Sequence, residues 1–320
     1  MTNLMTVAIT GVNGFIGRAL AAHLVVQGHR VLGLSRQGIL LPGVENRCTG
    51  GALNVDTLAH TLTQALAGAS TVVHLAAKAH QTDAALLQDD GQFDVNLQLT
   101  DALLTASQRA GVQRLVYVSS IGVNGQRTTS RAFTERDAPA PVEAYARSKW
   151  RCEQRVQQFS AATGLPHVIL RPPLVYGPHA PGNFGRLVHA LGQGWPLPLA
   201  AVHNRRHFIG IGNLVDAISL CLNHPAAANQ TYVLADNEAT STPDLLRLAA
   251  QAMQRPARLW PVPVPLLRWA AHLAGQTQAI NRLCDSLEVD NTALRQQTGW
   301  RPPLTLAEGL ARAVQKHPRT

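Results

Sequence analysis

The sequence predicts a doubly wound, parallel α/β sheet with a smaller α/β lobe on its C-terminal side. Short apolar runs alternate with helical stretches up to residue 172, three glycines separate the first run from the first helix, and prolines and glycines cluster from residue 173 onward. Continuous apolar runs joined by crossover helices are typical of parallel strands buried on both faces. We therefore expect a sheet domain over residues 1–172 and a lobe over residues 173–320, some of whose segments return to the sheet.

Each predicted strand is a β-branched or leucine-rich run between helical stretches. In chain order these runs cover residues 4–10, 30–34, 71–76, 114–120 and 167–172. In the lobe we expect shorter strands, with helices over residues 213–223, 241–254 and 305–317. Ser241 or Thr242 caps the second of these helices, and Asp244 lies in its first turn, where a carboxylate is favourable.

The composition indicates a globular protein with a substantial core, because 46% of its 320 residues are hydrophobic and 15% are charged. The four cysteines are far apart and form no CxxC pair, so we expect neither a disulfide framework nor a metal site. Such cysteine usage fits a reducing compartment. Because the N-terminus shows no secretory signal, we expect a cytoplasmic protein.

No uncharged apolar run is long enough to suggest a membrane span. The closest candidate, residues 259–275, contains three prolines and Arg268. We interpret this segment as a wall of the C-terminal lobe, with a helix lying on a membrane surface as the alternative.

The formal net charge is +9 and the sequence pI is about 10.1. Runs of lysine and arginine are absent from the sequence, so we do not predict nucleic-acid binding. A site for doubly charged anionic ligands on a generally basic surface explains the charge equally well.

Gly11, Gly14 and Gly17 lie between the first predicted strand and the first helix. A tight turn with positive φ and a close backbone approach to a pyrophosphate both require glycine, and a helix N-terminus offers free N–H groups to an anion. The spacing is GxxGxxG rather than GxGxxG, and a plain strand–helix turn is the alternative. The context predicts a Rossmann-like dinucleotide site.

The second predicted strand leads into Ser35 and Arg36, where a dinucleotide site often has a carboxylate. A carboxylate would bind the adenosine ribose hydroxyls and repel a 2′-phosphate. Arg36 would instead pair with that phosphate, and Ser35 would hydrogen-bond it. We therefore favour NADP(H) over NAD(H). The alternative is that Arg36 stacks on adenine or points to solvent.

Tyr145 and Lys149 lie four residues apart at the start of a predicted helix, so both project from one face. A tyrosine has an ordinary pKa of about 10. A nearby ammonium and an oxidised nicotinamide ring would favour the phenolate, so that Tyr145 exchanges a proton near neutrality. Ser120, at the end of a predicted strand upstream, would hydrogen-bond the substrate oxygen whose proton Tyr145 exchanges. Ser119 is the competing assignment.

With the glycine turn, the serine and the YxxxK pattern in this order, the chain resembles the extended short-chain dehydrogenase/reductase family, and within it the sugar-nucleotide epimerase/dehydratase branch. "HLAAK" (74–78), Asn96 and "RPPLVYGP" (171–178) also match. The resemblance implies hydride transfer at a sugar carbon, with Tyr145 exchanging the hydroxyl proton, Ser120 holding the oxygen and Lys149 fixing the cofactor ribose. It also implies a homodimer and further cofactor contacts at Asn13, Phe15, Ile16, Leu53, Leu75, Ala76 and Ala77.

By the same resemblance, the diphosphate of a UDP-sugar would be held by Asn183, Arg206, Arg282 and Asp285. Guanidinium groups bind phosphate bidentately, which suits this role. Arg205 is an alternative to Arg206, and a surface ion pair is the alternative role for Arg282 and Asp285. Ala52 departs from the family pattern, since relatives often carry an aspartate there.

Three reactions share this scaffold. Dehydratases carry an Asp-Glu pair where this chain has Ile121 and Gly122, so we do not expect dehydration. Ser35-Arg36, a C-terminal region similar to enzymes of surface-polysaccharide synthesis, and Gly210, where many epimerases have histidine, favour NADPH-dependent reduction of a UDP-4-keto-6-deoxy-N-acetylhexosamine. A UDP-hexose or UDP-N-acetylhexosamine 4-epimerase is the alternative, and a non-catalytic NADP(H) sensor is the minor one.

Overall fold

A parallel seven-stranded sheet forms the centre of the computed structural model, which describes residues 4–38, 40–50, 55–78 and 90–314. The strand order is β3-β2-β1-β4-β5-β6-β9, so the sheet is wound outward in both directions from β1. Its strands are β1 (Thr6–Thr10), β2 (Arg30–Ser35), β3 (Val44–Cys48), β4 (Thr71–His74), β5 (Arg114–Val118), β6 (His167–Arg171) and β9 (Gln230–Val233). The predicted fold class is confirmed.

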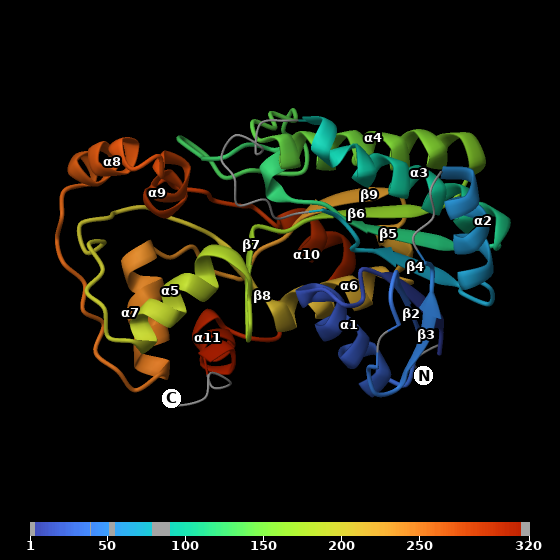
Figure 1. The fold of residues 1–320 in the computed structure, drawn as a ribbon, viewed down its shortest axis with the longest axis horizontal. Coiled ribbons are helices and arrows are strands. Elements are labelled where there is room, and N and C mark those ends of the chain that lie inside the picture. The colour runs from blue at the N-terminus through green and yellow to red at the C-terminus, as the bar shows by residue number, and fades with distance from the viewer. Residues whose placement is uncertain (1–3, 39, 51–54, 79–89, 315–320) are drawn as a thin grey trace.

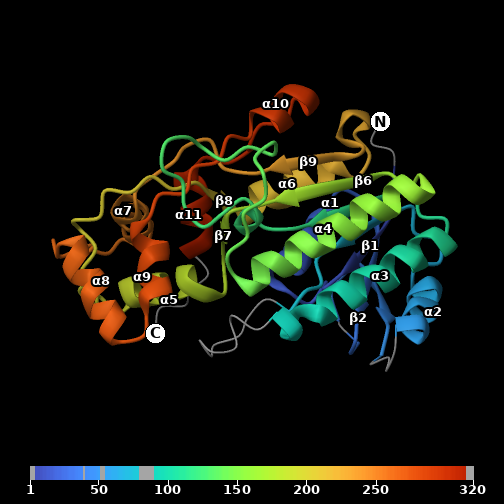
Figure 2. The same cartoon turned by 90° about the horizontal axis from the view of Figure 1, so that it is seen from above.

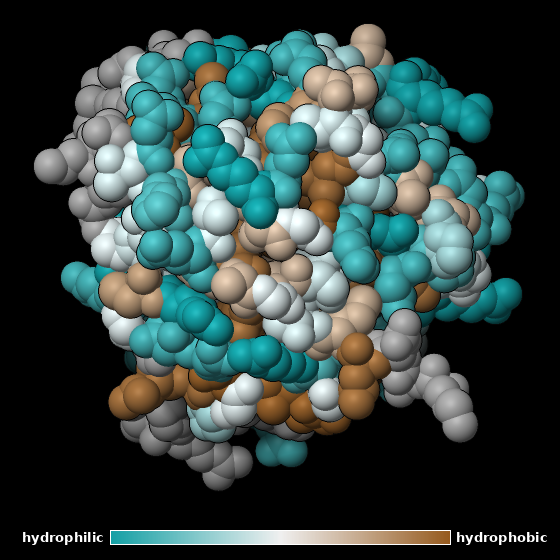
Figure 3. Space-filling model, turned by 90° about the vertical axis from the view of Figure 1, so that its right-hand side faces the viewer, coloured by the Kyte–Doolittle hydropathy of each residue, from teal (hydrophilic) through white to brown (hydrophobic). Residues whose placement is uncertain are grey.

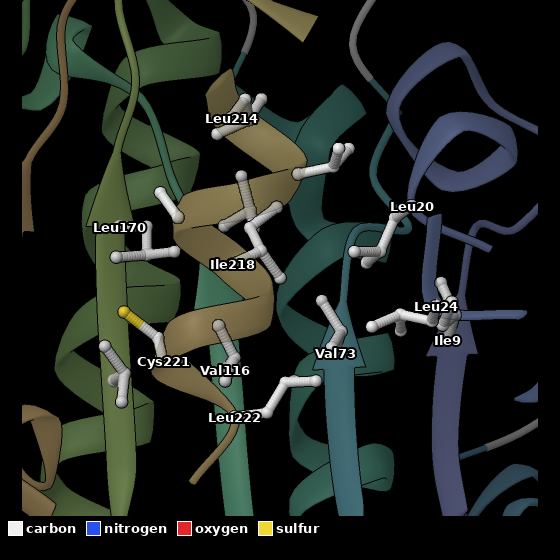
Figure 4. Close-up of a cluster of buried hydrophobic side chains, with 14 of the residues drawn as sticks. Ile9, Leu20, Leu24, Val73, Val116, Leu170, Leu214, Ile218, Cys221 and Leu222 are labelled. Carbon is white, nitrogen blue, oxygen red and sulfur yellow. The ribbon is translucent and has the colours of Figure 1, made fainter. Parts of the chain in front are cut away.

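Helices cover both faces of the sheet (Figure 1). On one face lie α2 (Val55–Ala65), α3 (Asp94–Arg109) and α4 (Ala144–Thr163), and on the other lie α1 (Phe15–Val26) and α6 (Ile211–Cys221). Figure 4 shows Leu214, Ile218 and Leu222 packed over strand residues Val73 and Val116. The helix from the C-terminal half of the chain therefore closes the core of the N-terminal half.

A smaller lobe stands beside the carboxyl ends of the strands (Figure 2). It has its own buried apolar cluster and a two-stranded parallel sheet of β7 (Leu174–Tyr176) and β8 (Phe208–Gly210). Its helices, with α10 returning toward the main sheet, are α5 (Gly182–Gly192), α7 (Thr242–Ala252), α8 (Val264–Leu273), α9 (Thr277–Cys284), α10 (Thr292–Thr298) and α11 (Leu306–Val314).

The opposite end of the molecule is mostly hydrophilic, with an apolar strip along one edge (Figure 3).

All five predicted strands are present within a few residues of their expected bounds, and α6, α7 and α11 match the three expected helices. Ser241 rather than Thr242 caps α7, because its Oγ accepts a hydrogen bond from the Asp244 amide at 3.1 Å. Two strands of the main sheet, β3 and β9, escaped prediction. They are the edge strands, and their sequences, VENRC and QTYV, lack a continuous apolar run.

Candidate active site

The glycine turn connects β1 to α1 at the carboxyl edge of the sheet. Gly11 has φ +69°, and a Cβ added there would lie 2.8 Å from the Ala76 amide nitrogen, so only glycine fits. A Cβ on Gly17 would clash with the Gly11 carbonyl oxygen. Gly14 is the N-cap of α1 and no side chain caps the helix. The turn thus leaves the N-terminus of α1 open to an anion.

The other predicted cofactor contacts surround this turn. Asn13, Phe15 and Ile16 lie in the turn and in the first residues of α1, while Leu75, Ala76 and Ala77 follow the neighbouring strand β4. Leu53 and Ala52 lie outside the described residues. Close backbone packing, an uncapped helix and the ends of adjacent strands together fit a dinucleotide, whose pyrophosphate would bind at Gly11–Gly17.

Ser35 and Arg36 stand at the end of β2, the strand next to β1. Arg36 is exposed, and within the described ranges no carboxylate pairs with its guanidinium. The Ser35 hydroxyl donates to the Gln37 carbonyl and must rotate before it can donate to a phosphate. The position predicted to receive a 2′-phosphate is therefore cationic and open.

Strand β5 delivers two serines with different surroundings. Ser119 is only 5% exposed, and its Oγ has no hydrogen-bond partner. Ser120 is partly exposed and caps the 3-10 helix Ile121–Val123, its Oγ accepting from the Gly122 amide at 3.2 Å. Only Ser120 is accessible enough to meet a substrate, which supports the choice of Ser120 over Ser119.

Tyr145 and Lys149 come from the first turns of α4, beside the end of β5. Lys149 is buried, and its Nζ donates to the Val118 carbonyl at 2.8 Å. The same Nζ lies 5.9 Å from the centroid of the Tyr145 ring and 4.9 Å from that of Tyr117. Phe93 packs edge-on against Tyr145, with ring centroids 6.0 Å apart. The fold thus brings Tyr145, Lys149 and the Ser120 end of β5 together.

Burial dominates the electrostatics of these residues. Desolvation lowers the pKa of Lys149 to about 8, although Cys152 and Glu153 act in the opposite direction. Desolvation also raises the pKa of Tyr145 to about 12. The activation of Tyr145 expected from the sequence therefore depends on the oxidised nicotinamide ring as well as on Lys149. Nearby His74 is held neutral by burial, with a pKa of about 3.

A buried ion pair that the sequence analysis missed supports this arrangement. Glu153 lies one turn after Lys149, and the Arg171 guanidinium at the end of β6 donates to its carboxylate at 2.6 to 3.2 Å. Arg171 also donates to the Asn124 side chain at 3.0 Å. The sequence does indicate Glu153, because Tyr145, Lys149 and Glu153 are four residues apart and therefore lie on the same helical face.

Three of the four predicted diphosphate residues, Arg206, Arg282 and Asp285, lie together where the lobe faces α4. Arg206 is buried, and its Nη1 donates to the Asp285 carbonyl oxygen at 2.7 Å. Desolvation lowers the pKa of Arg206 to about 10. The Asp285 carboxylate pairs with Arg268 at 2.7 Å, not with Arg282. Arg205, the alternative to Arg206, is exposed and pairs with Glu288 at 2.9 Å.

Arg282 spans the two parts of the molecule. Its Nη2 lies 2.5 Å from the carboxylate of Glu143, the N-cap of the catalytic helix α4. Asn183 lies at the start of α5, where its side chain accepts from Arg186 at 2.5 Å. Arg206, Arg282 and Asp285 are thus neighbours, whereas Asn183 comes from a separate element of the lobe.

Gly210, which stands where histidine was expected for an epimerase, is fixed by local packing. Its amide donates to both oxygens of the buried Asp236 carboxylate at 3.2 Å, and Tyr176 Oη donates to Asp236 at 2.7 Å. A Cβ at position 210 would lie 3.0 Å from Tyr176 Oη. A histidine here would require this network to rearrange.

Comparison with known proteins identifies the family. Residues 7–235 match the family described as "NAD dependent epimerase/dehydratase family". The chain belongs to this family. It is 31% identical over 313 residues to the UDP-glucose 4-epimerase of Vibrio cholerae, covering 97% of this chain and 94% of that protein. It is 27% identical over 268 residues to the N-acetyl-alpha-D-glucosaminyl-diphospho-ditrans,octacis-undecaprenol 4-epimerase of Escherichia coli O157:H7, with 79% of each covered.

Solved structures share the fold of this epimerase/dehydratase family member. The UDP-N-acetylglucosamine 4-epimerase of Bacillus cereus superposes with a TM-score of 0.78 at 19% identity, covering 97% of this chain and 95% of that one. The Bordetella bronchiseptica enzyme WbmG in complex with NAD gives a TM-score of 0.75 at 20% identity, covering 98% and 94%.

Membership in the NAD-dependent epimerase/dehydratase family confirms the enzyme family that the glycine turn, Ser120 and the YxxxK pattern predicted. The choice between NADP and NAD stays a prediction, as do the individual roles of the site residues and the homodimer. Among the residues described, none of the helices is long and apolar enough to cross a bilayer, and no cluster of side chains could hold a metal.

Proposed function

We propose that the protein is a UDP-sugar 4-epimerase, which oxidises the C4 hydroxyl and returns the hydride to the opposite face. The convergence of Tyr145, Lys149 and Ser120 beside the glycine turn carries this proposal. Ile121 and Gly122, next to Ser120, have no group that moves a proton. The site therefore suits oxidation and reduction at one oxygen, and it lacks the acid and base that elimination of water requires.

In this proposal each side chain acts on the C4 oxygen or its surroundings. A nicotinamide dinucleotide bound along the glycine turn supplies the hydride acceptor and donor. Tyr145 Oη takes the C4 hydroxyl proton and later returns it, while the Ser120 hydroxyl donates to the same oxygen. Lys149, buried beside the Tyr145 ring, favours the phenolate through its positive charge.

The basic residues of the lobe would hold the substrate's diphosphate. Arg206 and Arg282 lie on neighbouring segments around Asp285, and Arg282 already reaches an anion, the Glu143 carboxylate. A diphosphate would replace Glu143 as the partner of Arg282, since charge-assisted bonds to phosphate are at least as favourable. The names of the Vibrio cholerae and Bacillus cereus proteins support a UDP-sugar substrate.

One observation favours a second candidate, an NADPH-dependent 4-ketoreductase acting on a UDP-4-keto-6-deoxy-N-acetylhexosamine. Arg36 is exposed and forms no ion pair with a carboxylate of the described residues, which suits a 2′-phosphorylated cofactor that arrives reduced and leaves oxidised. A 4-epimerase causes no net redox change, so it needs no supply of reduced cofactor.

Two parallel incubations separate the candidates. Purified protein with UDP-glucose or UDP-N-acetylglucosamine and no added NADPH should invert C4, as followed by NMR of the sugar. Protein with NADPH and a UDP-4-keto-6-deoxy-acetamidosugar should leave the NADPH absorbance unchanged. Stoichiometric NADPH consumption without inversion would instead establish the reductase, and tight NADPH binding with neither reaction would indicate a sensor.

A further inference from the structure

Helix α8 presents an unusual outer face. It packs inward through Leu267 and Ala271, which are buried. On its other side Leu266, Trp269 and Leu273 are 51%, 61% and 67% exposed. These three follow the helical spacing of i, i+3 and i+7, so they form one continuous apolar stripe, which we call the α8 stripe. A short helix with two apolar faces needs something to cover the second.

Further exposed aromatic side chains lie on the segment that leads into α8 and on the loop that pairs with that segment. Trp260, four residues before the helix, is 61% exposed, and its amide donates to the Leu197 carbonyl at 2.8 Å. Trp195, two residues before Leu197, is 58% exposed. Both ribbon views place α8 at the end of the lobe away from the main sheet (Figures 1 and 2). Exposed tryptophan and leucine therefore concentrate at this end of the lobe.

Between Asp244 and Asp285 the chain carries cationic side chains and no acidic ones. Arg255, Arg258 and Arg268 lie in this interval and are exposed. Arg268 is paired with Asp285, whereas Arg255 and Arg258 donate to the carbonyls of Gly192 and Gly194. In the part of the chain that the structure describes, no carboxylate neutralises these two arginines.

From these observations we propose that the α8 stripe, together with Arg255 and Arg258 on the segment that leads into α8, docks the protein onto an anionic lipid surface. Tryptophan and leucine enter the boundary between headgroups and acyl chains, while cationic side chains pair with the headgroups. A second copy of this chain fits the stripe less well, because a two-fold contact would bring the same unpaired arginines together. Each docked arginine and apolar side chain adds affinity without any segment crossing the bilayer.

The position of α8 connects this surface to the catalytic site. Arg268 on α8 pairs with Asp285, whose backbone carbonyl accepts from Arg206, and α9 directly after α8 carries Arg282. Docking through α8 would hold the lobe's diphosphate-binding residues close to the lipid surface. The docking itself is independent of which sugar or cofactor the enzyme uses.

The test measures sedimentation of the full-length protein with phosphatidylcholine vesicles that contain or lack phosphatidylglycerol. We expect binding only with phosphatidylglycerol, falling as salt is raised, with a blue shift of tryptophan fluorescence. The partition coefficient of the triple variant Leu266→Ser/Trp269→Ser/Leu273→Ser should fall about tenfold or more, since the variant lacks most of the apolar area that α8 would bury in the lipid. Arg255→Ala/Arg258→Ala should weaken binding and flatten its salt dependence.

A matched control replaces Leu4, Val26 and Leu40, which are 68%, 87% and 100% exposed and lie on the sheet domain. This Leu4→Ser/Val26→Ser/Leu40→Ser variant should bind like the unaltered protein. Equal partition of the two triple variants, or no binding of the unaltered protein at low salt, would overturn the proposal. A dimer in solution that the α8 variant alone converts to monomer would show that a second copy covers the stripe instead.

Discussion

At the scale of single residues, the proposed chemistry depends on polar groups placed in a largely apolar setting. Lys149 is 3% exposed and gives one hydrogen bond to a backbone carbonyl, so most of its ammonium remains available to an incoming partner. Tyr145 has its pKa raised by the same burial. A binding partner with the right charges is required before this pair can exchange a proton.

Tyr145→Phe should abolish turnover while leaving cofactor affinity within about twofold, because the phenol hydroxyl is the proton carrier and the ring still packs on Phe93. Steady-state assays and a fluorescence titration with the dinucleotide measure the two effects. Near-normal rates would remove Tyr145 from the mechanism.

Cofactor affinity should fall as pH rises through about 8, the pKa of Lys149 in the free protein. Below this pH the ammonium is charged and attracts the anionic dinucleotide, and above it the amine is neutral. Dissociation constants measured from pH 6.5 to 9.5 would show the decline, and Lys149→Met should bind weakly at every pH without it. An unaltered slope in Lys149→Met would assign the decline to another group.

Arg36→Asp should change the cofactor preference toward NADH, since a carboxylate repels a 2′-phosphate and accepts from the ribose hydroxyls. A change of about tenfold or more in the ratio of NADPH to NADH affinity is expected. Arg36→Gln serves as the neutral control. If neither substitution changes the ratio, Arg36 does not contact the 2′ position.

Much of this site was predictable because its residues follow local rules. Gly11 is required by a positive φ, and Tyr145 and Lys149 share a helical face through their spacing alone. The partners of Arg282 and Asp285 were not predictable. Arg282 meets Glu143, far away in the chain, and such a contact depends on how the lobe settles against the sheet.

At the scale of secondary-structure elements, the buried pair of Glu153 and Arg171 joins three of them. It connects α4 to the end of β6, and through Asn124 to the turn that follows Ser120. The side chains are 0% and 4% exposed, so the pair is desolvated. Its geometry fixes the distance between the catalytic helix and the serine turn.

Glu153→Gln should lower the free energy of unfolding by about 3–5 kcal/mol, because Arg171 is left as an uncompensated buried charge. The double variant Glu153→Met/Arg171→Met should lose less than the sum of the losses of Glu153→Met and Arg171→Met, since it removes both charges. Urea unfolding of the unaltered protein, Glu153→Met, Arg171→Met and the double variant gives the coupling energy. Additive losses would mean that the two side chains do not stabilise one another.

The edge strands show why elements differ in how well a sequence predicts them. β1 and β6 are buried along nearly their whole length and have continuous apolar sequences. β3 lies at the edge of the sheet, next to β2. In its sequence, VENRC, charged residues alternate with uncharged ones, so the sequence resembles that of a loop. β9 forms a strand because β6 pairs with it, a long-range effect that its own four residues do not indicate.

At the scale of the whole molecule, binding regions and folding units do not coincide. The predicted cofactor contacts all lie before residue 172, yet α6 and β9 complete the sheet's second layer and its edge. A fragment of residues 1–172 should therefore aggregate and bind no dinucleotide, as measured by light scattering and fluorescence titration. A soluble fragment with native affinity would show that the first half folds alone.

The late position of β9 also has a consequence for synthesis on the ribosome. Two surfaces stay exposed until residues 211–233 have left the exit tunnel. They are the edge of β6 that pairs with β9 in the folded protein and the apolar face of the sheet that α6 covers. During that interval the nascent chain presents an unpaired strand and a hydrophobic face, the features that chaperones recognise and that promote aggregation. The N-terminal half of the chain therefore cannot reach its stable fold until residues 211–233 of the C-terminal half have been synthesised.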